Sequence, residues 1–150
     1  MSGRRTKKKA TLRHSPYLSP EDYLTFIELE GFTRGWKKLG LTDEDVMAIQ
    51  MCIMASPKGS PVVQHAGKLR KARFAPRRWK VGKSGAARIC YAYFEEFSVV
   101  LLVAIYDKTR TDDLTQEEKR QIKLLLERFE SSLKRGKGRR EKRDDSAQYR

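Results

Sequence analysis

Two neighbouring stretches decide the fold: ARICYAYF (Ala87–Phe94) and VVLLVAIY (Val99–Tyr106), separated by EEFS (95–98). The first stretch is rich in aromatic residues, which favours a β-strand. The second is apolar on both faces, which predicts the central strand of a sheet that is covered on both sides. Because only four residues separate the two stretches, we expect them to form an antiparallel hairpin.

The elements on either side of this hairpin complete a β-α-α-β-β-β-α order. Upstream, the sequence predicts a strand over 22–29, a short helix over 31–39 that Gly35 disfavours, a helix from the N-cap Thr42 to Ser56-Pro57, and a strand over Leu69–Ala75. Downstream, Thr115 and Glu118 form a capping box, and apolar residues at helical spacing follow it: Ile122, Leu125, Leu126, Phe129 and Leu133. The predicted fold class is α+β, a small antiparallel sheet of about four strands with helices packed on it.

The composition limits the classes of function. The 150 residues suffice for one domain, and 33 Lys and Arg against 19 Asp and Glu give a formal net charge of +14. Such a surface favours a polyanionic partner. We expect no transmembrane helix, no secretory signal and no membrane partner, and therefore a cytoplasmic protein. Cys52 and Cys90 lie within apolar blocks, which is typical of free buried thiols in a reducing compartment.

The charge divides the chain into three parts. Residues 1–20 are predicted to be a basic flexible arm, 21–134 a folded domain, and 135–150 a basic disordered tail. Much of the positive excess lies in the two tails. From Val46 to Phe94, however, there are ten cations and no Asp or Glu. A segment inside the predicted domain that carries only positive charges is less easily explained as part of a solvated tail.

The usual catalytic sets are weak in this sequence. His14 and His65 have no cysteine or carboxylate at ligand spacing, so we expect solvated loop residues, no metal site and no cofactor. The carboxylates at 43–45 and at 117–118 are explained by the starts of two helices. A hydrolase that uses paired carboxylates therefore has little support.

Cations on two predicted strands suggest another chemistry. Lys71 and Arg73 share one face of their strand, because side chains alternate, whereas Arg70 points to the other face. If the next strand pairs with this one, Arg88 joins Lys71 and Arg73 on a concave face, and Lys108 closes its rim. Crowding by like charges lowers the pKa of a lysine, which can then be a general base. Adjacent arginines can bind a phosphate and stabilise a pentacovalent phosphorus.

These groups suffice for metal-free RNA cleavage, in which a 2′-hydroxyl attacks the adjacent phosphate. The alternative is that the same cations only bind a polyanion. Residues expected to contact RNA outside the catalytic set are Arg70, Arg77, Arg78, Trp79, Lys80, Lys83 and Arg110. Trp79, in the segment RRWK, is the preferred candidate for stacking on a base, whereas we expect Tyr91 and Tyr93 to pack in the core.

Three motifs together resemble the RelE/HigB family of toxins from bacterial type II toxin–antitoxin systems, and the HigB-like branch most closely. They are LRKARF (69–74), GKSGAARICYAYF (82–94) and VVLLVAIYDKTRTDDLTQEEK (99–119), and the resemblance spans about Asp22 to Leu133. It implies the α+β order described above and a metal-free endoribonuclease that cleaves mRNA on the ribosome. The family's basic site residues correspond to Lys71, Arg73, Arg88 and Lys108. The implied partners are mRNA, the ribosome and a neutralising antitoxin, often of helix-turn-helix type.

Two other functions stay open. The protein could be a non-enzymatic RNA- or ribosome-binding protein that uses the same basic face. It could also resemble the ParE branch, which shares this fold and poisons DNA gyrase, because a fold does not determine a function. That branch would not need the convergent cations, so the cluster of Lys71, Arg73 and Arg88 argues mildly against it.

Overall fold

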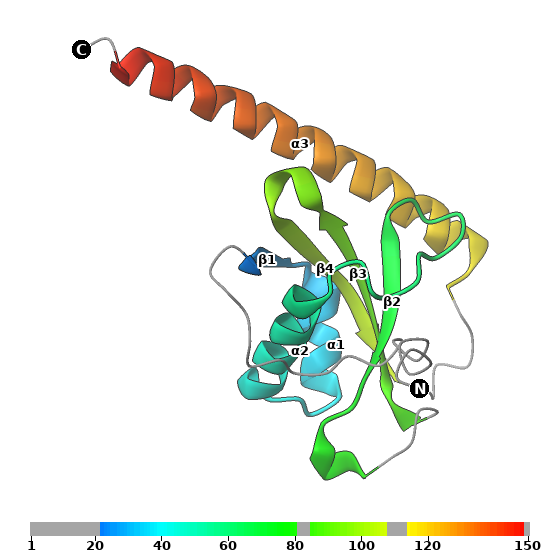
Figure 1. Cartoon of the computed structure of the whole chain (residues 1–150). Helices are drawn as coiled ribbons and strands as arrows, with labels where there is room; N and C mark the ends of the chain where they lie inside the picture. Colours follow the sequence, from blue (N-terminus) through cyan, green and yellow to red (C-terminus); the bar gives the residue numbers. More distant parts are fainter. Residues whose placement is uncertain (1–21, 81–84, 108–113, 149–150) are drawn as a thin grey trace, which may run out of the picture.

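The computed structural model describes residues 22–80, 85–107 and 114–148, with side chains in the last helix as far as 139 (Figure 1). The described residues form four strands and three α-helices in the predicted order: β1 (Thr25–Glu28), α1 (Glu30–Lys38), α2 (Asp43–Ala55), β2 (Leu69–Phe74), β3 (Ala87–Phe94), β4 (Val99–Tyr106) and α3 (Gln116–Gln148). Two short 3-10 helices, η3 (Arg77–Trp79) and η5 (Glu95–Phe97), lie between strands. The α+β class is therefore confirmed.

The four strands form one mixed sheet in the order β1-β4-β3-β2. β3 pairs antiparallel with both β2 and β4, as predicted for the hairpin. β1 pairs parallel with β4, from Thr25 opposite Val99 to Glu28 opposite Leu102. The prediction of a wholly antiparallel sheet is therefore wrong for β1. Apolar alternation specifies which face of a strand is buried, and it leaves the direction of the strand open.

The sheet is covered on both faces, and β4 supplies core residues to each (Figure 1). On one face, Val100, Leu102 and Ile105 pack in a cluster with residues of α1 and α2. On the other face, Val99, Leu101 and Val103 pack in a second cluster that includes Leu126 of α3. This confirms the prediction that Val99–Tyr106 is the central strand of a sheet covered on both sides.

A bulge in β4 changes which residues share a face. Cys90 pairs with Ala104 but Tyr91 pairs with Leu102, so Val103 is an extra residue in β4. Beyond the bulge, the alternation of β4 is displaced by one residue. Tyr106 therefore packs with the cluster on the α3 side, where strict alternation from Val99 would have directed it towards α1.

Helix α3 begins as predicted and extends further than predicted. Its capping box is present, with the Thr115 N–H donating to Glu118 Oε1 at 2.9 Å and the Glu118 N–H donating to Thr115 Oγ1 at 3.0 Å. Leu126 of this helix is buried against the sheet, whereas Leu125, which was also predicted to lie on the apolar face of the helix, is 38% exposed. The helix continues to Gln148 and projects beyond the sheet (Figure 1).

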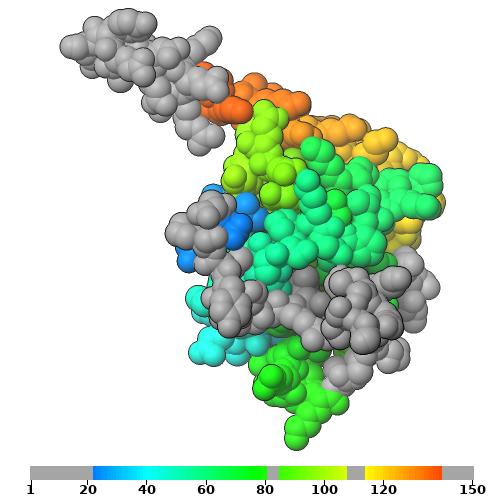
Figure 2. Space-filling view, viewed as in Figure 1, coloured from blue at the N-terminus to red at the C-terminus, as the bar shows by residue number. Residues whose placement is uncertain are grey.

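Helix α3 thus includes most of the segment 135–150, for which the sequence predicts a disordered tail. Extending a helix that has already formed costs far less than nucleating one, and this segment contains no proline. Lys137 also lies 3.3 Å from Glu96 and above the ring of Phe97, so α3 is held against the turn between β3 and β4 (Figure 2). The predicted basic arm, 1–20, lies outside the described residues.

Candidate nucleic-acid interface

Strand register brings Lys71, Arg73 and Arg88 to the same side of the sheet. Arg73 lies opposite Arg88, and Lys71 lies opposite Cys90, whose side chain packs in the cluster on the α3 side. All three cations are half-buried. We call Lys71, Arg73 and Arg88 the cationic face.

The cationic face contains two arginines opposite each other and one buried donor that an anion would satisfy. Residues directly opposite each other on antiparallel strands have Cβ atoms about 5 Å apart, and like charges there are destabilising. The Nε of Arg73 is buried and has no hydrogen-bond partner among the residues that the structure describes. Across from it, the guanidinium of Arg88 donates to the Ala86 carbonyl oxygen at 2.8 Å. An oxygen of a phosphate could satisfy the buried donor of Arg73.

Two residues beside the cationic face were not identified from the sequence. Tyr106 lies opposite Arg88 in the next strand, so Arg73, Arg88 and Tyr106 form one row across the sheet. The β4 bulge produces this row, and no sequence signal located the bulge. Lys119 of α3 lines a pocket of about 250 Å³ together with Lys71. Because Lys119 comes four residues after the cap Thr115, the sequence places it in the first turns of the helix. The sequence does not show where Lys119 lies relative to the sheet.

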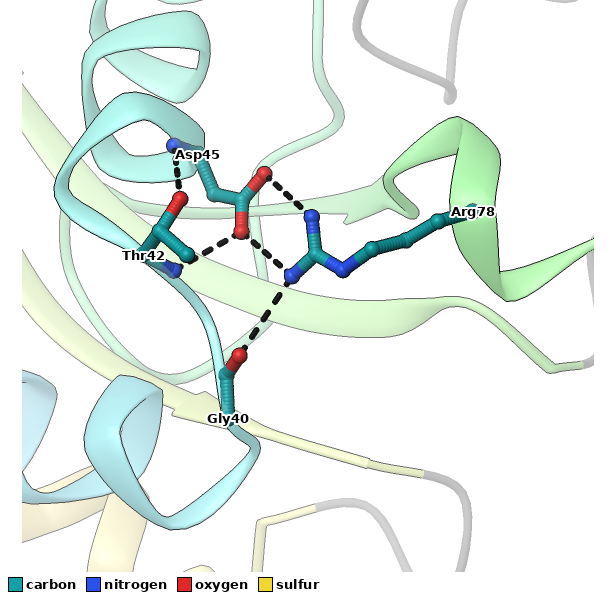
Figure 3. A network of polar contacts seen from close by, with 4 residues as sticks. All are labelled: Gly40, Thr42, Asp45 and Arg78. Carbon is teal, nitrogen blue, oxygen red and sulfur yellow. Dashed lines mark hydrogen bonds and ion pairs between the residues drawn. The ribbon is translucent and has the colours of Figure 1, made fainter.

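Arg78, predicted to contact RNA, makes hydrogen bonds within the chain (Figure 3). Its guanidinium donates to both carboxylate oxygens of Asp45, at 3.0 and 2.7 Å, and to the Gly40 carbonyl oxygen at 3.3 Å. Asp45 in turn accepts from the Thr42 N–H at 2.8 Å, and its own N–H donates to Thr42 Oγ1. Arg78 thus connects η3 to the capped start of α2 and positions the basic segment around Trp79.

This network predicts a loss of stability in acid. The hydrogen bonds from Arg78 lower the pKa of Asp45 below its ordinary value of 3.8, and those from Thr42 act in the same direction. The stabilisation is therefore complete above about pH 4 and is lost as the pH falls through the lowered pKa. We expect Asp45→Asn to reduce the free energy of unfolding by roughly 1–2 kcal/mol at pH 7. In thermal unfolding at several pH values, the difference from wild type should shrink below pH 4. A difference that is constant with pH would contradict this role.

Arg70, also predicted to contact RNA, anchors a loop on the other face of the sheet. Its guanidinium donates to the carbonyl oxygens of Ser60, at 2.6 Å, and Lys58, at 3.1 Å. These bonds hold the loop between α2 and β2 against the sheet. The position of Arg70 on the face opposite the cationic face agrees with the alternation of β2.

The remaining predicted RNA contacts fall into two groups. Arg77 and Lys80 are exposed on either side of Trp79, which is half-buried against the cluster on the α1 and α2 side. Only part of the Trp79 ring is therefore accessible for stacking on a base. Lys83, Lys108 and Arg110 lie outside the described residues.

The cysteines have the environment predicted for them. Both are free and buried, and burial raises the pKa of Cys52 to about 12, which makes its thiol a poor nucleophile. Within the described ranges, no group of three His, Cys, Asp or Glu side chains is arranged to hold a metal ion. None of the helices described is both long and apolar enough to cross a bilayer.

The molecule is thus an α+β protein with a mixed four-stranded sheet that presents a cationic face. No protein-family model matches the sequence. Among solved structures, the chain is similar to a double arginine-to-alanine mutant of the Escherichia coli toxin RelE in the free state. The sequence identity is 15% and the TM-score 0.43, over 59% of this chain and 87% of that chain.

Proposed function

We propose that this protein is a RelE/HigB-type toxin that cleaves mRNA on the ribosome in the cytoplasm and is neutralised by an antitoxin. One observation carries the proposal: Arg73 lies directly opposite Arg88, and its buried Nε has no partner among the described residues. A buried donor without a hydrogen-bond partner costs stability, and an oxygen of a phosphate can satisfy it. The observed element order is also the order that the sequence resemblance implies.

The proposed reaction is an internal transesterification of RNA. Lys71 takes the proton from a 2′-hydroxyl, and the 2′ oxygen then forms a bond to the adjacent phosphorus. The bond from phosphorus to the 5′ oxygen breaks, and the departing 5′ oxygen takes up a proton. The products are a 2′,3′-cyclic phosphate and a free 5′-hydroxyl. Arg73 and Arg88 hold the non-bridging oxygens and stabilise their growing negative charge, and Lys108 adds a further phosphate contact.

Other cations extend the binding surface in this proposal. Arg77 and Lys80 contact the flanking strand of mRNA, with Lys83 and Arg110 as additional contacts and Trp79 as a partial stacking surface. Arg70 and Arg78 contribute by holding the loops that they anchor. An antitoxin, of the helix-turn-helix type that is frequent in this family, would neutralise the toxin by covering the cationic face with an acidic segment.

The test is to map mRNA ends after induced expression of the wild-type protein in bacteria. We expect growth arrest together with new mRNA ends inside translated reading frames, because cleavage requires the ribosome. Salt-sensitive RNA binding without new ends would favour the non-enzymatic binder. DNA breaks with intact mRNA would favour a gyrase poison. Either result would contradict the proposal.

A further inference from the structure

We propose that the C-terminal part of α3, residues 134–148, binds double-stranded DNA as a basic helix that lies in the major groove. The inference goes beyond the proposed function and does not depend on it. We call residues 134–148 the projecting segment. Its backbone is helical to Gln148 and extends past the end of the sheet where β3 turns into β4 (Figure 1).

The projecting segment is densely basic. Residues 134–143 contain seven Lys and Arg and one Glu. Among those whose side chains are described, Lys134, Arg135 and Arg139 are exposed. At 3.6 residues per turn, the seven cationic positions are distributed around the helix axis and do not form one stripe. Such a helix suits a ligand that encloses it with phosphates on two sides.

The composition of the projecting segment argues against a protein or a membrane as its ligand. From 134 to 148 the only apolar residue besides two glycines is Ala147. Protein interfaces depend on large anchor side chains that fill pockets of the partner, and a helix that lies on a membrane needs an apolar face. The segment offers neither, so phosphate contacts are the interaction that its residues support.

The dimensions of the helix favour DNA over duplex RNA. An α-helix with its side chains is about 10–12 Å across, and the major groove of B-DNA is about 12 Å wide. The major groove of an A-form RNA helix is deep and narrow. At about 1.5 Å per residue, the segment is about 22 Å long, which is roughly two-thirds of one turn of DNA.

Two features of the projecting segment disfavour the helix when it is free. Glycine is a poor helix former, and a Cβ atom at Gly136 or Gly138 would meet nothing within 4 Å in the part of the chain that the structure describes. Packing against the domain therefore does not account for either glycine. Cations four residues apart, such as Arg135 and Arg139, also destabilise an isolated helix. Phosphates on both sides of a groove would stabilise these cations.

The base of the projecting segment is fixed to the domain. Glu130 of α3 pairs with Lys68 at 2.9 Å. One turn into the segment, Lys137 lies 3.3 Å from Glu96 and above the ring of Phe97. These contacts determine the direction in which the helix leaves the sheet, so that the residues beyond Lys137 extend away from the domain.

The projecting segment is remote from the cationic face. Lys137 contacts the turn that follows β3, whereas Arg88 lies near the start of that strand. At about 3.3 Å per residue, β3 separates Arg88 from the turn by about 20 Å. The two sites are therefore distinct, and substitutions in one should leave the other intact.

The test measures binding of the full-length chain to a labelled DNA duplex of about two helical turns, and to an RNA duplex of the same sequence, by fluorescence anisotropy at several salt concentrations. We expect wild type to bind the DNA duplex at least about fivefold more tightly than the RNA duplex, because only the DNA groove admits the helix. A variant with Arg139→Gln, Arg140→Gln, Lys142→Gln and Arg143→Gln should bind DNA more than about tenfold more weakly. Its salt slope should fall by about 3.6, which corresponds to four lost phosphate contacts.

A control variant removes the same amount of charge elsewhere. It carries Arg34→Gln, Lys37→Gln, Lys38→Gln and Arg120→Gln, which are exposed positions on α1 and at the start of α3. Both variants have the same net charge, and the control should keep the wild-type salt slope. Equal DNA affinities of the two variants would overturn the inference, as would an RNA duplex that binds as tightly as the DNA duplex.

A second pair of variants tests whether the segment binds as a helix. Glu141→Pro and Glu141→Gln both remove one negative charge, but only the proline breaks the helix. We expect Glu141→Pro to bind DNA roughly tenfold more weakly than Glu141→Gln, because the cations beyond the proline leave the groove. Equal affinities would show that charge alone determines binding and would overturn the inference.

Cleavage assays separate this inference from the proposed function. The variant that lacks the four cations of the projecting segment should cleave ribosome-bound mRNA at the wild-type rate. A parallel loss of cleavage and DNA binding would overturn the assignment of the segment to DNA. A wild-type protein that binds DNA as expected, but does not cut mRNA, would support the inference and contradict the nuclease.

Discussion

Replacement of Arg88 with alanine is expected to lower the rate of mRNA cleavage by about 10²–10³-fold, the usual effect of removing one donor from a site that stabilises negative charge in a transition state. Arg73→Ala should have an effect of similar size, because the two side chains lie directly opposite each other. The measurement is single-turnover cleavage of ribosome-bound mRNA by purified protein. The double variant should lose far less than the product of the two single effects, since both arginines hold one phosphate.

The matched control is Arg34→Ala. Arg34 is exposed on α1, which covers the other face of the sheet, and it pairs with Glu30. The Arg34→Ala variant should cleave mRNA at the wild-type rate. Thermal unfolding distinguishes a lost catalytic group from a damaged fold, because Arg73→Ala removes a buried unsatisfied donor and one of two opposed like charges. We therefore expect its unfolding temperature to equal or exceed that of wild type. Cleavage within twofold of wild type for either single variant would contradict the assigned roles.

The second large effect concerns stability, at Gly35 of α1. A Cβ atom at this position would overlap the carbonyl oxygen of Ile105 in β4 and lie 2.8 Å from Ile105 Cγ2. A strand backbone cannot move aside as the end of a flexible side chain can, so Gly35→Ala forces α1 away from the sheet. We expect a loss of about 1–3 kcal/mol in the free energy of unfolding, measured by urea titration.

Gly31 provides the control on the same helix. A Cβ atom there would lie 3.6 Å from the nearest atom, the carbonyl oxygen of Val103, which is an ordinary contact. Alanine also favours a helix over glycine, so Gly31→Ala should leave stability unchanged or raise it by up to about 1 kcal/mol. Equal effects of the two substitutions would show that α1 does not pack as closely on β4 as described.

The parts of the fold that local patterns specify were predictable. The strands Ala87–Phe94 and Val99–Tyr106 have the predicted bounds, because their apolar runs end at the same turn. The four residues of this turn are too few for any connection other than a hairpin. The caps at Thr42 and Thr115 were likewise predicted, since a cap depends on residues three apart in sequence.

Features that depend on distant contacts were not predictable. The parallel pairing of β1 with β4 joins segments more than 70 residues apart. Gly35 was interpreted as a residue that disfavours a helix. In the structure, the absence of a side chain at Gly35 allows α1 to lie close to the backbone of Ile105. The continuation of α3 past Arg135 is supported by Lys137 against Glu96 and Phe97, a contact that no periodicity within the helix reveals.

The candidate site likewise has features that the sequence predicts and features that depend on distant contacts. Alternation along β2 and β3 sufficed to predict that Lys71, Arg73 and Arg88 share a face. Nothing in the segment RRWK distinguished Arg78, which binds Asp45, from Arg77, which is exposed, because Asp45 is 33 residues away. Tyr106 joins the row with Arg88 only because Val103 is an extra residue in its strand.

The most direct test of the central claim uses purified protein and ribosomes carrying end-labelled mRNA, with and without a single 2′-deoxy substitution at the cleaved nucleotide. We predict cleavage that leaves a 2′,3′-cyclic phosphate and a 5′-hydroxyl, and no cleavage at the 2′-deoxy position. Unaltered mRNA in the presence of bound protein, or equal cleavage of the 2′-deoxy substrate, would contradict the account.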